Sequence, residues 1–389
     1  PLQPVALQQG FLQLCHELEG QLAEISGMDR VTLQPAAGAQ GELAGMLMIR
    51  KALAARGEGE RRRVLVPDSA HGTNPASAAM AGFSVAHVPT GRDGTMDLDA
   101  LRQQLGPDVA ALMVTAPNTL GIWEVRVEEA TRLVHESGGL VYGDGANLNA
   151  IVGRLRFGDL GFDVVHLNLH KTFSTPHGGG GPGAGPVCAT AELAPYLPAP
   201  VVEGDPAAAG SWRLGRPARS IGRLQQFHGS IAVLIRAYAY IRSLGLQGLR
   251  AVSEGAVLNA NYLKQLATGS FDIPYDRPVL HEVVLSGRRQ KKEDGIRTVD
   301  VAKRLIDYAI HPPTVYFPLI VEEALMIEPT ETEAREDIEA LAEALVAIAS
   351  EAKESPELLR EAPHDAPIGR LDEVTAARKP ELRWEGQPG

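Results

Sequence analysis

VVHLNLHKTFSTPHGGGGPGAGPV, residues 164–187, is the stretch of this chain that decides its fold class. Its apolar start, residues 164–169, predicts a buried strand, and His170 and Lys171 come directly after it. A lysine at the end of a buried strand is costly unless its charge is removed or used. One use is a Schiff base with an aldehyde cofactor, because a desolvated amine is more readily neutral and therefore nucleophilic. The glycines at 178–181 would let the backbone pass close to such a cofactor.

Short apolar runs alternate with helical patterns upstream of this segment. Most of the runs are continuously apolar, which is expected for strands of a parallel sheet that is covered on both faces. The predicted strands are 64–66, 85–88, 110–115, 140–142 and 164–169, and the predicted helices are 41–56, 75–81, 98–105 and 127–136. This alternation predicts a doubly wound α/β domain, in which ligands bind at the carboxyl ends of the strands.

The pattern changes from about residue 272, where we expect a smaller α+β domain. Residues 202–220 are predicted as an ordered loop, and residues 226–266 as one long helix or two joined ones weakened by internal glycines. The later segments are predicted as a strand (281–285), a solvated charged loop (287–295), a helix (299–308) and a final amphipathic helix (332–353). We place the large domain, with an N-terminal helix, at residues 1–255 and the small C-terminal domain at residues 256–389.

The composition excludes several classes of protein. The formal net charge is −11, so broad binding to nucleic acid or to an acidic membrane surface is not expected. No apolar run approaches the ~20 residues of a membrane span. Cys15 and Cys188 make no disulfide framework, so we expect unreactive thiols in a reducing, cytoplasmic compartment, and we expect no metal site. The start at Pro1, without a methionine, is typical of a fragment or a processed form.

Two segments upstream have residues that suit a flat, phosphorylated cofactor. AAGAQGE, residues 36–42, leads into a helix whose first N–H groups suit a phosphate, although an ordinary loop before a helix explains it equally well. DSAHGTNPA, residues 68–76, follows a predicted strand. Its His71 is either a surface loop residue or an imidazole stacked on a cofactor ring.

Two further segments complete the pattern. In YGDGANLNA, residues 142–150, Asp144 either caps a helix or pairs with a ring nitrogen, and Ala146 is small enough to lie under a flat ring. Lys171 alone is more often a snorkelling or ion-paired lysine. A phosphate loop, a stacking histidine, an aspartate and a lysine, in this order, are together the parts that a pyridoxal phosphate site requires.

The chain resembles the glycine decarboxylase P-protein family and, within it, subunit 2 of the two-subunit bacterial form. The resemblance runs from about residue 20 to the end and is carried by AAGAQGE, VPDSAHGTNPA, APNTLGIWE, DGANLNAI, GFDVVHLNLHKTFSTPHGGGGPGAGP, RSIGR and HPPTVYFPLIVEEALMIEPTETE. It implies the fold-type I architecture of pyridoxal-phosphate-dependent transferases, with a large doubly wound, mainly parallel sheet domain and a smaller α+β C-terminal domain.

The resemblance also implies roles for individual residues. Lys171 would hold pyridoxal 5'-phosphate as a Schiff base, Asp144 would pair with the pyridine nitrogen, and His71 and Ala146 would lie on the two faces of the ring. The remaining expected cofactor contacts are the backbone of Gly38 and Ala39 and the side chain of His170 at the phosphate, and Thr119 at the ring or its 3-oxygen. Arg223 and His177 are candidates for carboxylate or lipoyl contacts, with a structural role preferred for both.

The activity implied is decarboxylation of glycine with transfer of the aminomethyl group to the lipoyl arm of H-protein. The expected partners are lipoylated H-protein and P-protein subunit 1, in a complex of two of each subunit in the bacterial cytoplasm. The family's subunit 2 usually has a further N-terminal segment near the active site, and this sequence starts after it. The expected explanations are a truncated form of the chain or a protein that has lost part of its substrate pocket and small domain.

Two alternatives remain open on the residues alone. The pattern of His71, Asp144, His170 and Lys171 is shared with other pyridoxal phosphate decarboxylases of the same fold. A desulfurase would need a catalytic cysteine on a mobile loop, and Cys15 and Cys188 are poorly placed for that. The second alternative is a non-catalytic structural subunit of the same complex, against which the presence of Lys171 counts.

Overall fold

The computed structural model describes residues 3–175, 181–208, 210–225, 228–383 and 386. The chain divides into two compact units, each assembled from segments that are not contiguous in sequence. The larger unit comprises Pro1–Tyr262, Tyr275–Val283 and Glu328–Ala334. The smaller unit comprises Leu263–Pro274, Val284–Ile327 and Arg335–Gly389. Two short pieces of the C-terminal third therefore belong to the larger unit.

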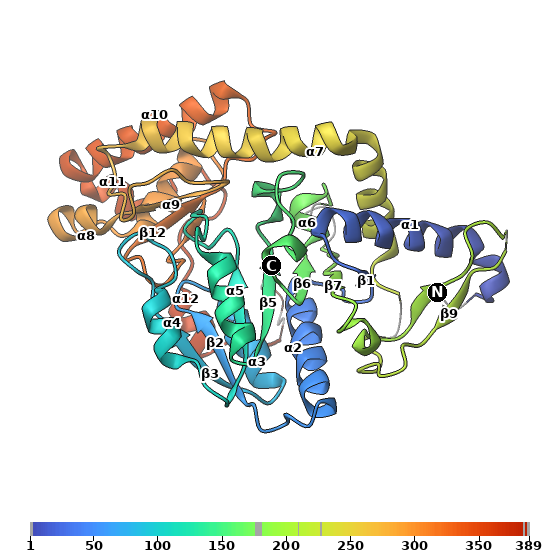
Figure 1. Ribbon diagram of the computed structural model, residues 1–389. Helices are drawn as coiled ribbons and strands as arrows, with labels where there is room; N and C mark the ends of the chain where they lie inside the picture. Colours follow the sequence, from blue (N-terminus) through green and yellow to red (C-terminus); the bar gives the residue numbers. More distant parts are fainter. Residues whose placement is uncertain (1–2, 176–180, 209, 226–227, 384–385, 387–389) are drawn as a thin grey trace. The chain divides into compact units, whose positions relative to one another are not determined.

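A seven-stranded sheet with the order β1-β7-β6-β5-β4-β2-β3 forms the centre of the larger unit (Figure 1). Its strands are β1 (Arg30–Thr32), β2 (Arg63–Pro67), β3 (Ser84–Val88), β4 (Val109–Thr115), β5 (Leu140–Gly145), β6 (Val164–Leu167) and β7 (Val187–Ala189). Strands β3, β2, β4, β5 and β6 run parallel, and β7 is antiparallel to both β6 and β1. The predicted strands of the parallel part are confirmed, whereas β1 and β7 are too short to show a sequence pattern.

Both faces of this sheet are buried, which explains the continuously apolar strands. Within β2, Val64 and Val66 lie in one apolar cluster and Leu65 lies in another. The first cluster includes α2 (Gly38–Ala55) and α3 (Thr73–Met80), and the second includes α1 (Gln9–Ser26), α4 (Leu98–Gln104) and α5 (Val127–Glu136). Each fully buried aliphatic side chain contributes about 1.5–3 kcal/mol, so the two layers of helices fix the sheet firmly. The predicted doubly wound domain is confirmed.

A long helix, α7 (Ile231–Ala267), follows the sheet and is interrupted inside. Gly245 has φ 58° and ψ −170°, a conformation that breaks the helical hydrogen-bond pattern. The chain therefore forms two joined helices here, as the internal glycines predict.

Residues 202–220, expected as a loop, instead contribute to a two-stranded antiparallel ribbon of β8 (Val201–Glu203) and β9 (Arg213–Gly215). Short 3₁₀ helices are η1 (Val5–Leu7), η2 (Leu148–Ala150), η3 (Gly158–Leu160) and η5 (Ala194–Tyr196).

The smaller unit contains a three-stranded sheet with the order β10-β12-β11. Its elements are β10 (Val283–Ser286), β11 (Thr314–Val315), β12 (Ala324–Ile327), α8 (Arg288–Asp294), α9 (Thr298–Asp307), α10 (Arg335–Glu354), α11 (Pro356–Glu361) and α12 (Glu373–Arg378). The solvated loop expected at 287–295 is wrong, because this segment forms α8. Gln290 is buried there and its Nε2 donates to the Ser270 carbonyl at 2.7 Å, so one face of the charged helix packs inward.

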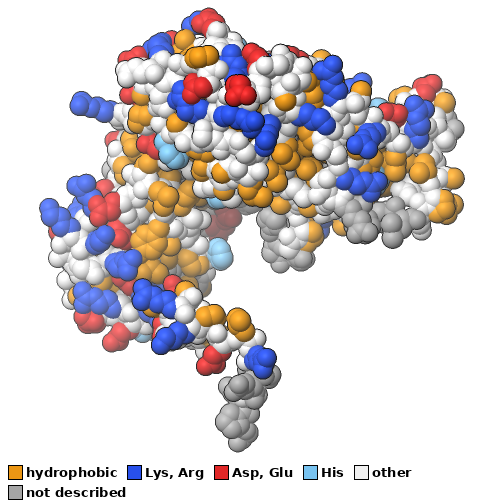
Figure 2. All heavy atoms as spheres, turned by 90° about the horizontal axis from the view of Figure 1, so that it is seen from below, with side chains coloured by type: hydrophobic (Ala, Val, Ile, Leu, Met, Phe, Trp, Pro, Cys, Tyr) orange, Lys and Arg blue, Asp and Glu red, His pale blue; other side chains and the backbone are white. Residues whose placement is uncertain are grey.

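Charged side chains are spread over the molecular surface. On the face seen in Figure 2, Lys and Arg side chains are scattered with Asp and Glu among them, and apolar side chains show between them. Such a mixture is usual for a folded protein, because polar surface alone cannot cover a molecule of this size. Among the described residues, no helix is both long enough and apolar enough to span a membrane.

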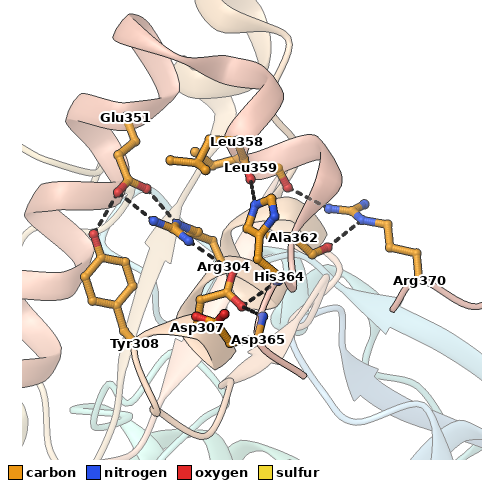
Figure 3. A network of polar contacts seen from close by, with 10 residues as sticks. All are labelled: Arg304, Asp307, Tyr308, Glu351, Leu358, Leu359, Ala362, His364, Asp365 and Arg370. Atoms are coloured by element: carbon orange, nitrogen blue, oxygen red, sulfur yellow. Dashed lines mark hydrogen bonds and ion pairs between the residues drawn. The ribbon is translucent and has the colours of Figure 1, made fainter. Parts of the chain in front are cut away.

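A network of polar contacts ties α9, α10 and the C-terminal residues of the smaller unit together (Figure 3). The Arg304 guanidinium donates to both carboxylate oxygens of Glu351 at 2.9 and 3.0 Å, and the Tyr308 hydroxyl donates to the same carboxylate at 2.8 Å. Asp307 accepts from the backbone N–H groups of His364 and Asp365 at 2.6 and 3.1 Å. These contacts explain why the chain beyond α10 returns to α9.

The same contacts shift the titration of both carboxyl groups. The hydrogen bond from Arg304 is the main cause that lowers the pKa of Glu351 below its ordinary value. For Asp307, burial acts to raise the pKa, but the two backbone donors and Arg304 outweigh it and the pKa is lowered. A group with a lowered folded-state pKa stabilises the fold above its unfolded pKa and loses that contribution as the pH falls through the folded value.

Replacing Glu351 by Gln should lower the free energy of unfolding at neutral pH by about 1 kcal/mol, because a partly exposed charge-assisted hydrogen bond is lost. The difference between wild type and variant should shrink as the pH falls below about 4, where the wild-type carboxylate is progressively protonated. Thermal unfolding as a function of pH measures both effects. Glu339→Gln, which removes an exposed pair with Arg335 on the same helix, is the matched control and should change little. A pH-independent difference for Glu351→Gln would contradict the assignment.

Candidate active site at the carboxyl edge of the sheet

The carboxyl ends of four parallel strands bring the predicted segments to one edge of the sheet. His71 follows β2, Thr119 follows β4, Asp144 lies within the end of β5, and Lys171 follows β6. The strand register places Asp144 beside Thr115 of β4 and His166 of β6. This edge is the usual ligand site of a doubly wound sheet.

Asp144 is the centre of the site and is 2% exposed. Its Oδ1 accepts from the Ala146 N–H at 2.9 Å, and its Oδ2 accepts from Asn74 Nδ2 at 3.1 Å. The Nε2 atom of His166 lies 3.4 Å from Oδ1. A buried carboxylate is tolerated when such donors surround it. The 3₁₀ helix that follows begins at Leu148 with Asn147 at its N-cap, so capping of that helix is not the role of Asp144.

Two residues behind Asp144 were not singled out in the sequence. His166 is 1% exposed, and its Nδ1 contacts the hydroxyl of the fully buried Tyr142. Burial lowers the pKa of His166, so its imidazole is neutral at neutral pH. Both residues lie inside apolar strand patterns, which is why sequence reasoning assigned them to the core.

The space for these two rings comes from glycines on α2. A Cβ atom added to Gly41 would lie 2.8 Å from the Gly185 carbonyl oxygen and 2.9 Å from His166 Cβ. A Cβ added to Gly45 would lie 2.6 Å from the ring of Tyr142. Real Cβ atoms do not approach so closely, so only glycine fits at these positions. The spacing of these glycines on one helix face is the sequence signal that could have identified the two residues behind Asp144.

Glu42, on the same helix, is a second buried carboxyl group and was also missed. It is 4% exposed and accepts from Thr73 Oγ1 at 2.8 Å and from Ser77 Oγ at 3.2 Å. Burial first, and the charge of Asp144 second, raise the pKa of Glu42 to about 7. At neutral pH this group is therefore protonated in a substantial fraction of molecules, which reduces its repulsion of the Asp144 carboxylate.

One oxygen or nitrogen of each of Glu42, Asp144 and His166 lies within 4.8 Å of the others. Residues of these types can hold a divalent cation. Here, however, the carboxylate oxygens already accept hydrogen bonds from four donors of the protein, which leaves fewer lone pairs for a metal. The arrangement suits the placement of one carboxylate better than metal coordination.

Lys171 does not sit at the end of a buried strand, so that expectation is wrong. Strand β6 ends at Leu167, and the helical turn α6 (Leu169–Thr172) buries Leu169 and Thr172 while its lysine is exposed. Its positive charge still acts on the buried groups of the site, where it lowers the pKa values of Glu42 and His166 alongside larger effects of burial. The lysine therefore lies near the carboxyl edge and is accessible to solvent.

The first turn of α2 offers backbone donors at the same edge. Its N-cap residue, Ala37, is extended and has no side chain that can accept from the N–H groups of Gly38 and Ala39. These N–H groups and the positive end of the helix suit an anion. His170 is half-buried, and its Nδ1 accepts from the Ala184 N–H at 3.2 Å, so the proton of the neutral ring is on Nε2. In that tautomer the Nε2–H group of His170 can donate a hydrogen bond.

The other predicted cofactor contacts differ in how firmly they are held. His71 is exposed, but its Nδ1 accepts from the Thr73 N–H at 3.2 Å, and Thr73 in turn donates to Glu42. Thr119 is buried, and its hydroxyl donates to the Ser69 carbonyl. Ala146 is half-buried. Of the remaining predicted residues, His177 and positions 178–180 lie outside the described residues.

A second buried acid–histidine pair lies in the larger unit. His281 and Glu282 are 1% and 3% exposed, and His281 Nε2 lies 3.5 Å from Glu282 Oε2. Burial lowers the pKa of His281 and raises that of Glu282 well above its ordinary value. The charge of Lys171 acts on both groups. Both are therefore neutral groups near the candidate site, and no periodic pattern in the sequence distinguishes them.

The two cysteines are buried, Cys15 on α1 and Cys188 on β7. Burial raises the pKa of Cys188 to about 12 and that of Cys15 further still. Thiols of this kind are poor nucleophiles, because the thiolate is the reactive form. Neither cysteine can serve as the exposed nucleophile of a desulfurase.

Two family models match the chain, Aminotransferase class-V over residues 42–181 and Glycine dehydrogenase, C-terminal domain, over residues 252–364. Two curated relatives are each named probable glycine dehydrogenase (decarboxylating) subunit 2. The protein from Halalkalibacterium halodurans is 59% identical over 389 residues, which are 99% of this chain and 78% of the relative. The protein from Desulforamulus reducens is 58% identical over 387 residues, which are 99% of this chain and 79% of the relative.

A solved structure shares the fold. It is the crystal structure of a glycine decarboxylase (P-protein) of the glycine cleavage system in an inhibitor-bound form. The TM-score is 0.75 at 23% sequence identity, and the match covers 90% of this chain and 78% of that chain. This likeness confirms the predicted fold class of a large, mostly parallel sheet with a smaller C-terminal part.

Replacing Gly41 by Ala should lower the free energy of unfolding by about 1–3 kcal/mol, because the added methyl group meets the Gly185 carbonyl and His166. The opposite is expected at Gly20 on α1, whose Cβ position has no neighbour within 4 Å among the described residues. There, alanine should stabilise by about 0.5–1 kcal/mol through its helix propensity. Denaturant unfolding of both variants measures the two changes in free energy. A Gly41→Ala variant as stable as the wild type would contradict the close packing inferred at Gly41.

Proposed function

The chain belongs to the family of glycine dehydrogenase (decarboxylating) subunit 2, and we propose that it is the subunit that binds pyridoxal phosphate on Lys171 and decarboxylates glycine. As a subunit 2, it functions together with a partner subunit. The observation that carries the cofactor proposal is the edge of the sheet itself. A buried, hydrogen-bonded Asp144, a helix N-terminus whose N-cap residue Ala37 provides no capping side chain, and the charge of Lys171 meet there.

The residues present fit the three parts of the cofactor. The N–H groups of Gly38 and Ala39, with the Nε2–H of His170, would bind the phosphate. Asp144 would accept a hydrogen bond from the protonated ring nitrogen, and the Lys171 amine would be the covalent attachment point. His71, tied to Thr73, would lie on one face of the ring and Ala146 on the other. Thr119 would contact the ring edge, with its hydroxyl already held by Ser69.

When bound, pyridoxal phosphate supplies an electron sink for the electron pair left behind by the departing carboxylate. The Asp144 carboxylate would hold the proton at the ring nitrogen, which would keep that sink effective. Glu42, with a pKa raised to about 7, does not add a full second negative charge beside Asp144 at neutral pH. The Lys171 amine, when not bonded to the cofactor, would hold or move a proton at Nζ. Its exposed position allows this exchange with solvent.

The aminomethyl group would then pass to the lipoyl arm of H-protein. In this step the bond between the glycine carbon and its carboxylate breaks with loss of CO₂, and a C–S bond forms to one sulfur of the lipoyl disulfide. The S–S bond breaks, and the second sulfur takes up a proton as a thiol.

We further propose a complex with P-protein subunit 1 that contains two copies of each subunit. The free thiols of Cys15 and Cys188 support a reducing, bacterial cytoplasmic setting.

Replacing Lys171 by Ala should abolish the visible absorption band of the protein-bound cofactor, because its covalent attachment point is gone. Lys51→Ala is the matched control, because Lys51 lies on α2 and its Nζ donates to the Ser220 carbonyl. It should keep the band. An absorption spectrum of each purified variant after addition of pyridoxal phosphate makes the measurement. An unchanged band in Lys171→Ala would show that another lysine holds the cofactor.

The substrate is tested by isotope exchange between labelled bicarbonate and the carboxylate of glycine. The wild-type chain, with its partner subunit and lipoylated H-protein, should incorporate label into glycine, and Lys171→Ala should not. Larger amino acids offered in place of glycine should remain unlabelled. Exchange into a larger amino acid, independent of H-protein, would instead favour another decarboxylase of the same fold. A cofactor band without any exchange would favour a non-catalytic subunit.

A further inference from the structure

Tyr142 and His166 form a buried polar pair directly behind Asp144, and the proposed reaction gives them no task. Buried polar groups of this kind are costly unless they are hydrogen-bonded, and an apolar pair of the same volume would fill the space as well. Both rings lie against the glycine face of α2, where Gly41 and Gly45 leave room for them. The helix is therefore shaped to accept these two particular side chains.

The hydrogen-bond chemistry fixes the tautomer of His166. If its Nδ1 carried the proton, Nε2 would turn a lone pair toward the Asp144 carboxylate 3.4 Å away, which is repulsive. The favourable arrangement has the Tyr142 hydroxyl donating to Nδ1, which leaves the proton on Nε2, the atom that faces Asp144 Oδ1. A phenol that is fully buried stays protonated, and burial raises the pKa of Tyr142 well above its ordinary value.

Other titratable groups around His166 favour the neutral ring. Asp144 and Tyr142 face it from β5, Glu42 faces it from α2, and the charge of Lys171 acts on it from α6. Asp144 favours the protonated imidazole, whereas burial and Lys171 oppose it, and burial is the largest effect. The ring therefore presents a neutral N–H donor to Asp144 and leaves the negative charge of the carboxylate in place.

We propose that Tyr142 and His166 are positioning residues that orient the Asp144 carboxylate toward the ring nitrogen of the cofactor. The inference rests on the proposed cofactor site at Asp144 and Lys171. Asn74 and the Ala146 N–H donate hydrogen bonds to the carboxylate. His166, whose Nδ1 contacts the Tyr142 hydroxyl, places its Nε2 3.4 Å from Asp144 Oδ1. Neither positioning residue needs to touch the cofactor, since both act through Asp144.

The test compares substitutions that keep or remove the donor at Nε2. His166→Leu removes it, whereas His166→Gln places an amide N–H close to the position of Nε2. Loss of the polar contact between His166 Nε2 and the Asp144 carboxylate should weaken binding of pyridoxal phosphate roughly tenfold or more in His166→Leu. Its kcat in the glycine exchange assay should fall while the KM for glycine stays close to the wild-type value, because substrate contacts are intact. His166→Gln should restore most of both properties.

Tyr142→Phe keeps the ring on α2 but removes the hydroxyl that orients His166, and it should show a smaller loss in the same two measurements. Tyr196→Phe is its control, because Tyr196 is also buried and loses the hydrogen bond that its hydroxyl accepts from Arg219. Thermal unfolding without cofactor should fall by a similar amount in the two tyrosine variants, but only Tyr142→Phe should bind pyridoxal phosphate more weakly.

Three outcomes would overturn the inference. Wild-type cofactor affinity and kcat in His166→Leu would do so, as would an equal loss in His166→Leu and His166→Gln, because that result indicates packing rather than a donor. Identical behaviour of Tyr142→Phe and Tyr196→Phe would remove Tyr142 from the proposal. Failure of the proposed function has a different signature, namely a wild-type chain that shows no Lys171-dependent cofactor band at all.

Discussion

The architecture of the larger unit depends on the burial of one carboxylate, Asp144, at the end of β5. A buried charge must be surrounded by donors, and each donor comes from a different part of the chain. Asn74 is on α3, the Ala146 N–H is in the following turn, and His166 is on the neighbouring strand. The glycine face of α2 then follows from the volume of the rings behind the carboxylate. Residues that are far apart in sequence are therefore all needed to bury this one carboxylate.

Burial and exposure are divided between the two groups that matter most to the proposed chemistry. The carboxylate is shielded from water and held by the protein, whereas the Lys171 amine is exposed on a helical turn. The division suits their tasks, because Asp144 must keep one geometry and one charge, and the amine must move and exchange protons. Glu42 is buried like Asp144, and its pKa, raised to about 7, limits the negative charge around that carboxylate at neutral pH.

Sequence patterns predicted the parallel sheet and most of its helices, because covered strands and amphipathic helices have distinct periods. They also led to Asp144, His170 and Lys171, since turns after buried strands expose residues that carry chemistry. They failed where contacts with other parts of the fold decide whether a residue is buried or has a polar partner. Lys171 was expected to be buried because nothing local marks the end of β6 at Leu167. His166 and Tyr142 were hidden within apolar runs, and Glu42 within a helix, because their polar partners come from other elements.

The antiparallel strand β7 has a consequence for synthesis of the chain. Strand β1 joins the sheet by pairing with β7, whose residues are translated after those of β2 to β6. At a translation rate of roughly 5–20 residues per second, the N-terminal segment waits on the order of ten seconds or more on the ribosome for that partner. During this interval the apolar face of α1, with Leu12, Leu18 and Leu22, has no completed sheet to cover it. The nascent chain therefore exposes this apolar helix face until β7 has been synthesised.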